Sequence, residues 1–156
     1  DGISPVRFLS VPPGQYHVSV RHRNHLGVMT ANVFNLTNEP TIVDFTSPNL
    51  SLYGTNTCAS IGSKKALWLG DANQDKKVIH AGPNNDIFHL FSEIMNAPGN
   101  VNFNVNYIVE GYLLSDLNMD GNAIFDGPNN DRSYSFIQAV QYCGAMNCLL
   151  VEQIPD

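Results

Sequence analysis

A repeated acidic segment constrains this chain more than any other feature of its sequence. Residues 71–86 have the sequence DANQDKKVIHAGPNND, and residues 116–131 have the sequence DLNMDGNAIFDGPNND. Both copies carry oxygen-bearing side chains at positions one, three and five, and both end in an aspartate. Alternating oxygen ligands closed by a later carboxylate are the pattern by which a short loop binds Ca²⁺. Because the copies begin at Asp71 and Asp116, 45 residues apart, a whole supersecondary unit has been duplicated.

We therefore predict two calcium ions, one in each copy. Calcium loops of the EF-hand type supply side-chain oxygens at positions one, three and five, a backbone carbonyl at position seven, and a closing carboxylate. Three carboxylates leave about one net negative charge around a divalent ion, which favours Ca²⁺ over Mg²⁺ in a flexible cage. The alternative is an array of Asx turns without an ion, but such turns do not require the same acids twice at the same distances. The predicted ligands are Asp71, Asn73, Asp75, the carbonyl of Lys77 and Asp86 in the first copy, and Asp116, Asn118, Asp120, the carbonyl of Asn122 and Asp131 in the second.

Position six distinguishes the two copies. A calcium loop of this type needs a positive φ there, which glycine adopts without steric cost. The second copy has Gly121 at this position, whereas the first has Lys76. Holding a residue with a Cβ atom in that conformation costs about 1 kcal/mol. We expect the first loop to bind its ion more weakly or to adopt a different turn. In both copies the closing acid follows a Gly-Pro-Asn-Asn stretch, which we expect to form a turn that lengthens the loop.

A helix is expected after each loop, over residues 87–96 and 132–142. Gly99 and Gly144 lie near the positions where a helix C-terminus favours glycine. The aspartates that close the two loops are the predicted N-caps, because a carboxylate there can serve both the metal and the amides of the first helical turn.

The first third of the chain has the alternating pattern of β-strands. Tyr16, Val18 and Val20 alternate with polar residues over residues 16–22, after a Pro-Pro-Gly turn. A sandwich of immunoglobulin type has about seven strands, so four or five strands predict an incomplete one. Further strands are expected at residues 6–11, 31–36, 41–45 and 50–53, separated by Gly, Pro and Asn.

Together these patterns predict an α+β fold with two units. A partial β-sandwich, of immunoglobulin or prealbumin type, is expected over residues 1–55. A linker rich in Gly, Ser and Thr is expected over residues 56–66, and the tandem calcium-binding repeats over residues 67–156. Trp68 precedes the first loop directly, and we expect it to anchor the repeats in the core.

Composition and charge exclude several classes of partner. The chain of 156 residues has 14 acidic and 8 basic residues, a net charge of −6, and no cluster of Lys and Arg that would bind nucleic acid or an anionic membrane. No apolar run approaches the roughly 20 residues of a membrane span. The chain begins at Asp1-Gly2 without the pattern of a signal peptide, so we expect a mature product or a chain whose beginning is missing.

The three cysteines do not have the paired spacing of a zinc site. Cys143 and Cys148 are close enough to form a disulfide across the turn at Gly144, which would suit an oxidising compartment, and buried unpaired thiols are the alternative. Cys58 is left over in either case, to pair with another chain or to stay reduced.

No catalytic constellation is evident, and we expect no enzymatic activity. His22, Arg23 and His25 suggest a transition-metal or catalytic site, but they lie at a predicted strand end and turn, where such residues more often hydrogen-bond to neighbouring carbonyls, and no Cys or Glu stands at ligand spacing. The loop aspartates do not suit a glycosidase, because a general acid needs an apolar environment to raise its pKa.

The repeats resemble a known family. Asp-x-Asn-x-Asp occurs twice, each time followed by a predicted helix, and this resembles the type I dockerin repeat. The variant with Gly-Pro-Asn-Asn-Asp is similar to the dockerin-like C-terminal regions of large secreted bacterial surface proteins, and residues 20–30 resemble the β segment that precedes those repeats. The resemblance covers most of the chain and implies calcium loops. Dockerin helices of cellulosomes dock on a cohesin partner, and the extended closing loops depart from that pattern.

These observations lead us to expect a secreted or cell-surface structural module that calcium stabilises. A short strand set leaves a sheet edge that a strand of a neighbouring subunit could complete, so we expect a protein partner or self-assembly into a filament. The alternative is a C-terminal accessory module of a secreted enzyme that binds carbohydrate or protein.

Overall fold

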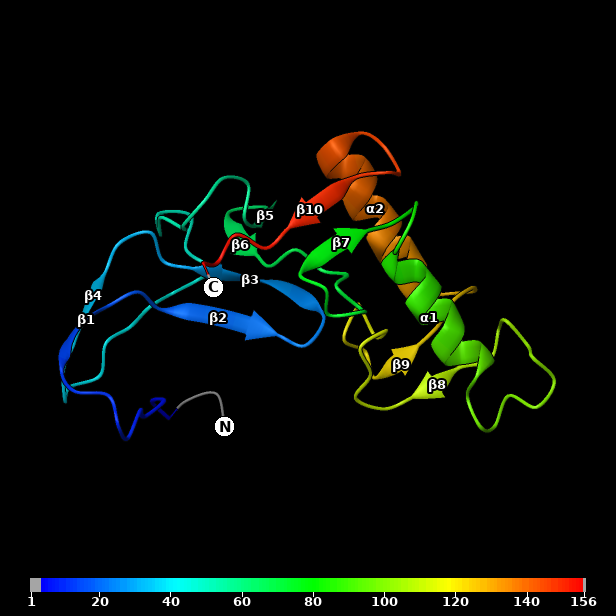
Figure 1. The fold of residues 1–156 in the computed structure, drawn as a ribbon, viewed down its shortest axis with the longest axis horizontal. Helices are drawn as coiled ribbons and strands as arrows, with labels where there is room; N and C mark the ends of the chain where they lie inside the picture. Colours follow the sequence, from blue (N-terminus) through cyan, green and yellow to red (C-terminus); the bar gives the residue numbers. More distant parts are fainter. Residues whose placement is uncertain (1–3, 156) are drawn as a thin grey trace.

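Residues 4–155, the part of the chain that the computed structural model describes, form ten short strands and two helices (Figure 1). Seven strands precede the first helix. Within that range the strands pair into five antiparallel sheets of two strands each. Residues 1–3 and 156, with which the expected units begin and end, lie outside the described range. The elements are β1 (Gly14–Tyr16), β2 (Ser19–His22), β3 (His25–Met29), β4 (Phe34–Leu36), β5 (Ala59–Ile61), β6 (Lys64–Ala66), β7 (Lys77–Ile79), α1 (Asp86–Met95), β8 (Val109–Glu110), β9 (Asn122–Ala123), α2 (Asp131–Cys143) and β10 (Leu149–Val151).

The strands of the first third form two separate pairs. β2 and β3 make a hairpin with Val20 opposite Val28, and β1 pairs with β4 with Tyr16 opposite Phe34. The strand expected over residues 16–22 is therefore divided between two sheets. Among residues 4–155 no sheet has more than two strands. The α+β class is confirmed, whereas the sandwich architecture is not.

Three of the expected strands do not form. Residues 6–11 and 41–45 contain no strand, and residues 50–53 contribute one isolated bridge. In the first two segments several apolar side chains stay in solvent, as Val6 is 79% exposed and Ile42 is 88% exposed. An apolar alternation makes a stable strand only where other strands supply hydrogen bonds and a face to pack on. Among the described residues no strand pairs with residues 6–11 or 41–45, whereas residues 50–53 bond to the end of β3 and the chain just after it without forming a strand.

Both helices begin one residue earlier than expected. The N-caps are Asn85 and Asn130, whose side-chain oxygens each accept the backbone N–H three residues later at 2.8 Å. The prediction of Asp86 and Asp131 as N-caps is wrong, because these carboxylates turn back into the loops and accept N–H groups there. No helix within residues 4–155 is long and apolar enough to cross a membrane.

The C-terminal ends of the helices differ. Gly144 ends α2 in the left-handed conformation, with φ of 67°, as the sequence predicts. Helix α1 ends earlier than expected, with Asn96 as its C-cap. Cys143, the last residue of α2, and Cys148, just before β10, form a disulfide across the turn at Gly144, with 5.6 Å between their Cα atoms. The third cysteine, Cys58, is a half-buried free thiol.

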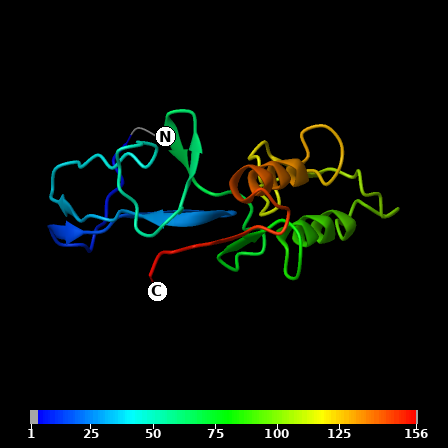
Figure 2. The same ribbon diagram turned by 90° about the horizontal axis from the view of Figure 1, so that it is seen from above.

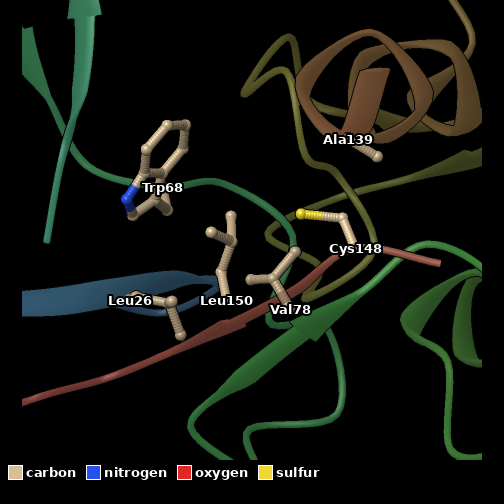
Figure 3. Packing of buried hydrophobic residues seen from close by; sticks show 6 residues of the cluster. All are labelled: Leu26, Trp68, Val78, Ala139, Cys148 and Leu150. Atoms are coloured by element: carbon tan, nitrogen blue, oxygen red, sulfur yellow. The ribbon is translucent and has the colours of Figure 1, made fainter. Parts of the chain in front are cut away.

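A cluster of buried residues joins the β2–β3 hairpin to the repeats (Figure 3). Trp68 is 6% exposed, which confirms it as a core anchor. The N–H of Leu26 in β3 donates to the carbonyl of Trp68 at 2.9 Å. The cluster therefore contains residues from both sides of the expected linker 56–66, most of which is the β5–β6 hairpin. Its members are Leu26, Trp68, Val78, Ala139, Cys148 and Leu150.

The C-terminal strand returns to the first loop. β10 pairs with β7, with Leu150 opposite Val78, and both lie beside the end of the β2–β3 hairpin (Figure 1). Helices α1 and α2 lie side by side on the far side of β7 in both views (Figure 2). A second buried cluster, Leu90, Ile94 and Ala123, packs α1 against β9. The two predicted loops are thus held by packed elements at their ends.

Candidate metal centres

The two loops have the same backbone conformation. At position six, Lys76 has φ of 65° and Gly121 has φ of 89°. The first loop therefore does not adopt a different turn, and of the two expectations for Lys76 only the weaker affinity stays a prediction. The left-handed residues also match at two further pairs of positions, Gln74 with Met119 (60° and 64°) and Asn84 with Asn129 (57° and 58°). The last pair lies in the Gly-Pro-Asn-Asn stretch, which forms the predicted turn.

Positions one, three and five each accept a backbone N–H from farther along their own loop. Asp71 accepts from Lys76 at 3.2 Å, Asn73 from Asp75 at 3.0 Å, and Asp75 from Lys77 at 2.9 Å. The second loop repeats the three bonds at 3.1, 2.9 and 3.0 Å. These bonds hold the side chains turned into the loop. In the first loop each accepting oxygen keeps a second lone pair that a cation can use. In the second loop Asp116 Oδ2 also accepts from Arg23, and Asp120 Oδ1 accepts two N–H groups of Asn122, so a cation there must compete with these donors or use the other oxygens.

The closing aspartates tie both ends of each loop to the following helix. Asp86 is 1% exposed, and it accepts the N–H groups of Ala72 at 2.9 Å, Asn73 at 3.4 Å and Ile79 at 2.8 Å. The sequence predicted Asp86 as a ligand. It did not predict these three hydrogen bonds, because their donors are backbone N–H groups, which have no sequence signature. A carboxylate has about four lone-pair sites, and the three N–H groups leave room for a cation. The ligand role of Asp86 therefore stays a prediction. Asp131 accepts the equivalent bonds from Leu117, Asn118 and Ile124 at 2.7, 3.2 and 2.8 Å.

The strand pairing turns the carbonyl of position seven toward the loop. The N–H of Glu152, which follows β10, donates to the carbonyl of Lys76 at 2.9 Å, whereas the N–H of Lys77 donates inward to Asp75. Because the N–H and C=O of one strand residue point to the same edge, the carbonyl of Lys77 also points into the loop. Asn122 in β9 stands in the equivalent register opposite Glu110, and its N–H also donates inward.

Burial makes the carboxylates of the loops costly to ionise, so the expectation that these aspartates lack an environment that raises the pKa is wrong. It raises the pKa of Asp71 to about 6, that of Asp86 to about 7 and that of Asp131 to about 6, against the lowering effect of the backbone N–H groups that each accepts. One oxygen of Asp71, Oδ1, is buried and has no hydrogen-bond partner within residues 4–155. A bound cation would stabilise the ionised form of these groups and would give that oxygen a partner.

Carboxylates alone do not build the cage. Within residues 4–155 no three side chains of His, Cys, Asp or Glu come together as a metal cluster. Two of the five predicted ligands in each loop are an Asn amide oxygen and a backbone carbonyl, so the cage needs neutral oxygens to close. That donor set is typical of Ca²⁺ and unlike the His and Cys ligands of zinc.

The surroundings of the two loops differ most at position one. Arg23, in the β2–β3 turn, pairs with Asp116 Oδ2 at 3.0 Å. Its guanidinium also lies over the ring of Tyr112, 3.9 Å from the centroid. Asp71 has no such ion pair among the described residues and lines an open hollow of about 360 Å³ beside the same turn. The ion pair joins residues 93 apart in sequence, so no local pattern could have predicted it.

His22 and His25 take part in a hydrogen-bond network around Asn24. Their Nδ1 atoms lie 3.1 and 2.8 Å from the side-chain oxygen of Asn24, and Arg23 donates to Nε2 of His22 at 3.3 Å. Because a guanidinium only donates, this contact places the proton of His22 on Nδ1, which lies within hydrogen-bond distance of both Asn24 and Nδ1 of His25. Burial lowers the pKa of His25 to about 4. These contacts agree with the hydrogen-bonding role expected for the two histidines.

Comparisons with protein-family models, with curated proteins and with solved structures find no significant match to this chain.

Proposed function

We propose that this protein is a calcium-stabilised extracellular module that holds or assembles other components, with one ion in each of the two loops. Calcium here is a structural ion, and catalysis is not part of the proposal. The backbone bonds of the closing aspartates support this role, because they place two buried carboxylates where they join loop to helix.

The observation that carries the proposal is the identical construction of the two loops. The inward hydrogen bonds and the left-handed positions recur at the same 45-residue offset that relates Asp71 to Asp116. Lys76 has the left-handed conformation of Gly121 even though that conformation is strained for a residue with a Cβ atom. In both loops the side chains at positions one, three and five accept N–H groups of their own loop, and we propose that their oxygens and the carbonyl of position seven converge on the ion. An array of turns without an ion gives no reason to maintain a buried, unpartnered carboxylate oxygen at Asp71.

The disulfide supports an extracellular location. A bond between Cys143 and Cys148 persists in oxidising compartments and is rare in the cytosol. We further propose that the repeats form a dockerin-like pair and that the first third is part of a sandwich completed by another segment or subunit.

Strand addition is the assembly route that the structure favours. Among the described residues the pairs β1–β4 and β2–β3 have only two strands each. The outer edge of β3 already bonds to Trp68 and Tyr53, so the outer edges of β1, β2 and β4 are the candidates for addition of another strand. The segments beside them expose apolar side chains such as Val6, Leu9 and Ile42. The rival role, an accessory module of a secreted enzyme, predicts a monomer that binds carbohydrate or protein. Native mass spectrometry and electron microscopy separate them, since a uniform monomer at high concentration contradicts self-assembly.

Calorimetry on chelator-stripped protein tests the calcium sites. Two Ca²⁺ ions should bind, and Asp75→Ala and Asp120→Ala should each remove one, because both residues are exposed ligands whose loss leaves the core intact. Asp44→Ala is a matched control, since Asp44 is an exposed aspartate that accepts local N–H bonds outside the loops. Absence of Ca²⁺ binding, or saturation by Zn²⁺ in preference to Ca²⁺, would reject the assignment.

A further inference from the structure

The turn between β2 and β3 touches the first residue of both loops. In both views of the fold the hairpin directs this turn at the repeats (Figures 1 and 2). Asn24 in the turn is 0% exposed. Its backbone carbonyl accepts the N–H groups of Gly70 at 2.9 Å and Asp71 at 3.1 Å. Asp71 is position one of the first loop, so the backbone of Asn24 fixes where that loop begins.

The side chain of Asn24 makes the matching contacts with the second loop. Its Nδ2 donates to the carbonyls of Leu114 at 2.9 Å and Asp116 at 2.6 Å. The Nδ1 atoms of His22 and His25 lie against the amide oxygen. Because the two backbone carbonyls can only accept, the nitrogen of the amide must face them and its two ends cannot exchange. Asp116 is position one of the second loop. A single buried residue therefore holds both first ligand positions.

Arg23 extends the same connection. Its Nε donates to the carbonyl of Leu113 at 2.8 Å, and its guanidinium pairs with Asp116. Its own carbonyl accepts a bond from the side chain of Gln74 in the first loop at 3.3 Å. Among the described elements, β7 and β9 do not pair with each other, so the two loops are not joined by a direct strand pair. The turn is the hydrogen-bonded path that reaches the first residue of each loop, and a separate path joins His80 of the first loop to Ser135 of α2 at 3.1 Å.

We propose that the Arg23–Asn24 turn couples the two calcium loops, so that an ion in one loop raises the affinity of the other. This inference rests on the proposed function. An ion that orders the first loop fixes the N–H groups of Gly70 and Asp71 and thereby fixes Asn24. The second loop then loses less conformational freedom when its own ion binds, because Asn24 already positions Asp116. Asn24 is a positioning residue for both sites and a ligand of neither.

The test is a cycle of calcium affinities measured by calorimetry on the full chain. Asp75→Ala and Asp120→Ala give the affinity of each loop alone. The product of the two wild-type association constants should exceed the product of the two single-loop constants by about fivefold or more. By reciprocity the loss seen in each loop when the other is disabled should be equal. A ratio of about one in the wild type overturns the proposal, whereas absence of calcium binding in every chain rejects the proposed function instead.

Asn24→Leu isolates the turn, because leucine is similar in size and cannot donate to Leu114 and Asp116. The ratio should fall to about one in this background. Asn100→Leu is the matched control, since Asn100 is also buried and its Nδ2 also donates to two carbonyls, those of Ile94 and Asn104, away from both loops. Asn100→Leu should keep the wild-type ratio. Persistence of the ratio in Asn24→Leu, or its equal loss in Asn100→Leu, overturns the role of Asn24.

A second measurement does not depend on whether Asn24→Leu folds. In Asp120→Ala, whose second loop is disabled, Ca²⁺ added to the first loop should slow hydrogen exchange at the amides of Leu117 and Gly121 by about fivefold or more, matching the coupling ratio. Equal exchange rates with and without Ca²⁺ would show that the first loop does not order the second.

Discussion

The two loops share a backbone but have different neighbours. Their left-handed residues and inward hydrogen bonds match position by position. The first loop leads into β7, which pairs with the distant strand β10, whereas the second leads into β9, which pairs with the nearby β8. Asp71 keeps an unpartnered oxygen, and Asp116 has Arg23 as its counter-ion. Local sequence therefore preserved the shape of the duplicated loop, while tertiary contacts gave the copies different electrostatic surroundings.

Chelation should have the largest effect, because it acts on both loops. An ion that binds only the native state stabilises it by about 2.7 kcal/mol for each site at a hundredfold excess over Kd. Removal of Ca²⁺ should lower the melting temperature and increase proteolysis between Leu69 and Asp131. Thermal unfolding with and without chelator measures this, and the double variant Asp75→Ala, Asp120→Ala should be insensitive. An unchanged wild-type melting curve would mean that turns alone hold the loops.

Arg23→Met should act directly on the second loop, where it should lower the stability of the calcium-free protein and raise the affinity for Ca²⁺. Without Ca²⁺ it leaves Asp116 as a buried charge without its partner, which costs about 3 kcal/mol. With Ca²⁺ the ion replaces the guanidinium as the counter-charge, so the loss of stability should be smaller and the affinity of the second loop higher. Melting curves in chelator and calorimetry in Ca²⁺ measure the two effects.

Arg21→Met is the matched control for this variant, because Arg21 pairs with Glu152 instead of with a loop residue. If Arg23→Met weakens the second site, Arg23 supports that site and does not compete with its ion.

Acidification should test the side of the turn that faces the first loop. The pKa of His25 is lowered from 6.5 to about 4, because burial disfavours its charged form. The unfolded chain therefore binds more protons between these values, so stability is full above pH 6.5 and falls as the pH drops toward 4. Between pH 6.5 and 5 the free energy of unfolding should fall by roughly 1.5 kcal/mol less in His25→Gln than in the wild type.

The comparison of wild type with His25→Gln is made in chelator, so that the effects of the buried carboxylates cancel between the two proteins. Parallel stability curves for the two proteins would show that His25 is not the group that titrates. His89→Gln, at a half-buried position of α1 away from the turn, is the control.

The substitution at position six should have the smallest effect. Lys76→Gly removes the cost of a positive φ and should tighten the first site by about 1 kcal/mol, and Gly121→Lys should loosen the second by a similar amount. Lys76→Met removes the positive charge but keeps a Cβ atom at a positive φ. It therefore separates the effect of the charge on calcium affinity from the effect of the backbone conformation. Calorimetry measures each affinity. If Lys76→Met tightens the first site as much as Lys76→Gly does, charge and not conformation distinguishes the loops.

The sequence by itself determined the features that depend on neighbouring residues. The loop turns, the two helices, the Gly144 cap and the burial of Trp68 were predicted, because repeated Asx residues, helix-length segments and glycine positions act within a few residues. The predicted N-caps were wrong by one residue, since Asn85 and Asn130 compete for the same first-turn N–H groups and the aspartates have other donors in the loops.

Only the tertiary structure decided which strands found partners and what the ligand positions touch. Residues 6–11 and 41–45 have the apolar pattern of strands but no neighbour to pair with, whereas β10 forms because β7 lies beside it. Asn24 and Arg23 meet the loops across about half the chain length, through backbone carbonyls and one ion pair. Such contacts depend on where the core of Leu26 and Trp68 places the hairpin, and a backbone carbonyl has no sequence signature by which to predict its partner.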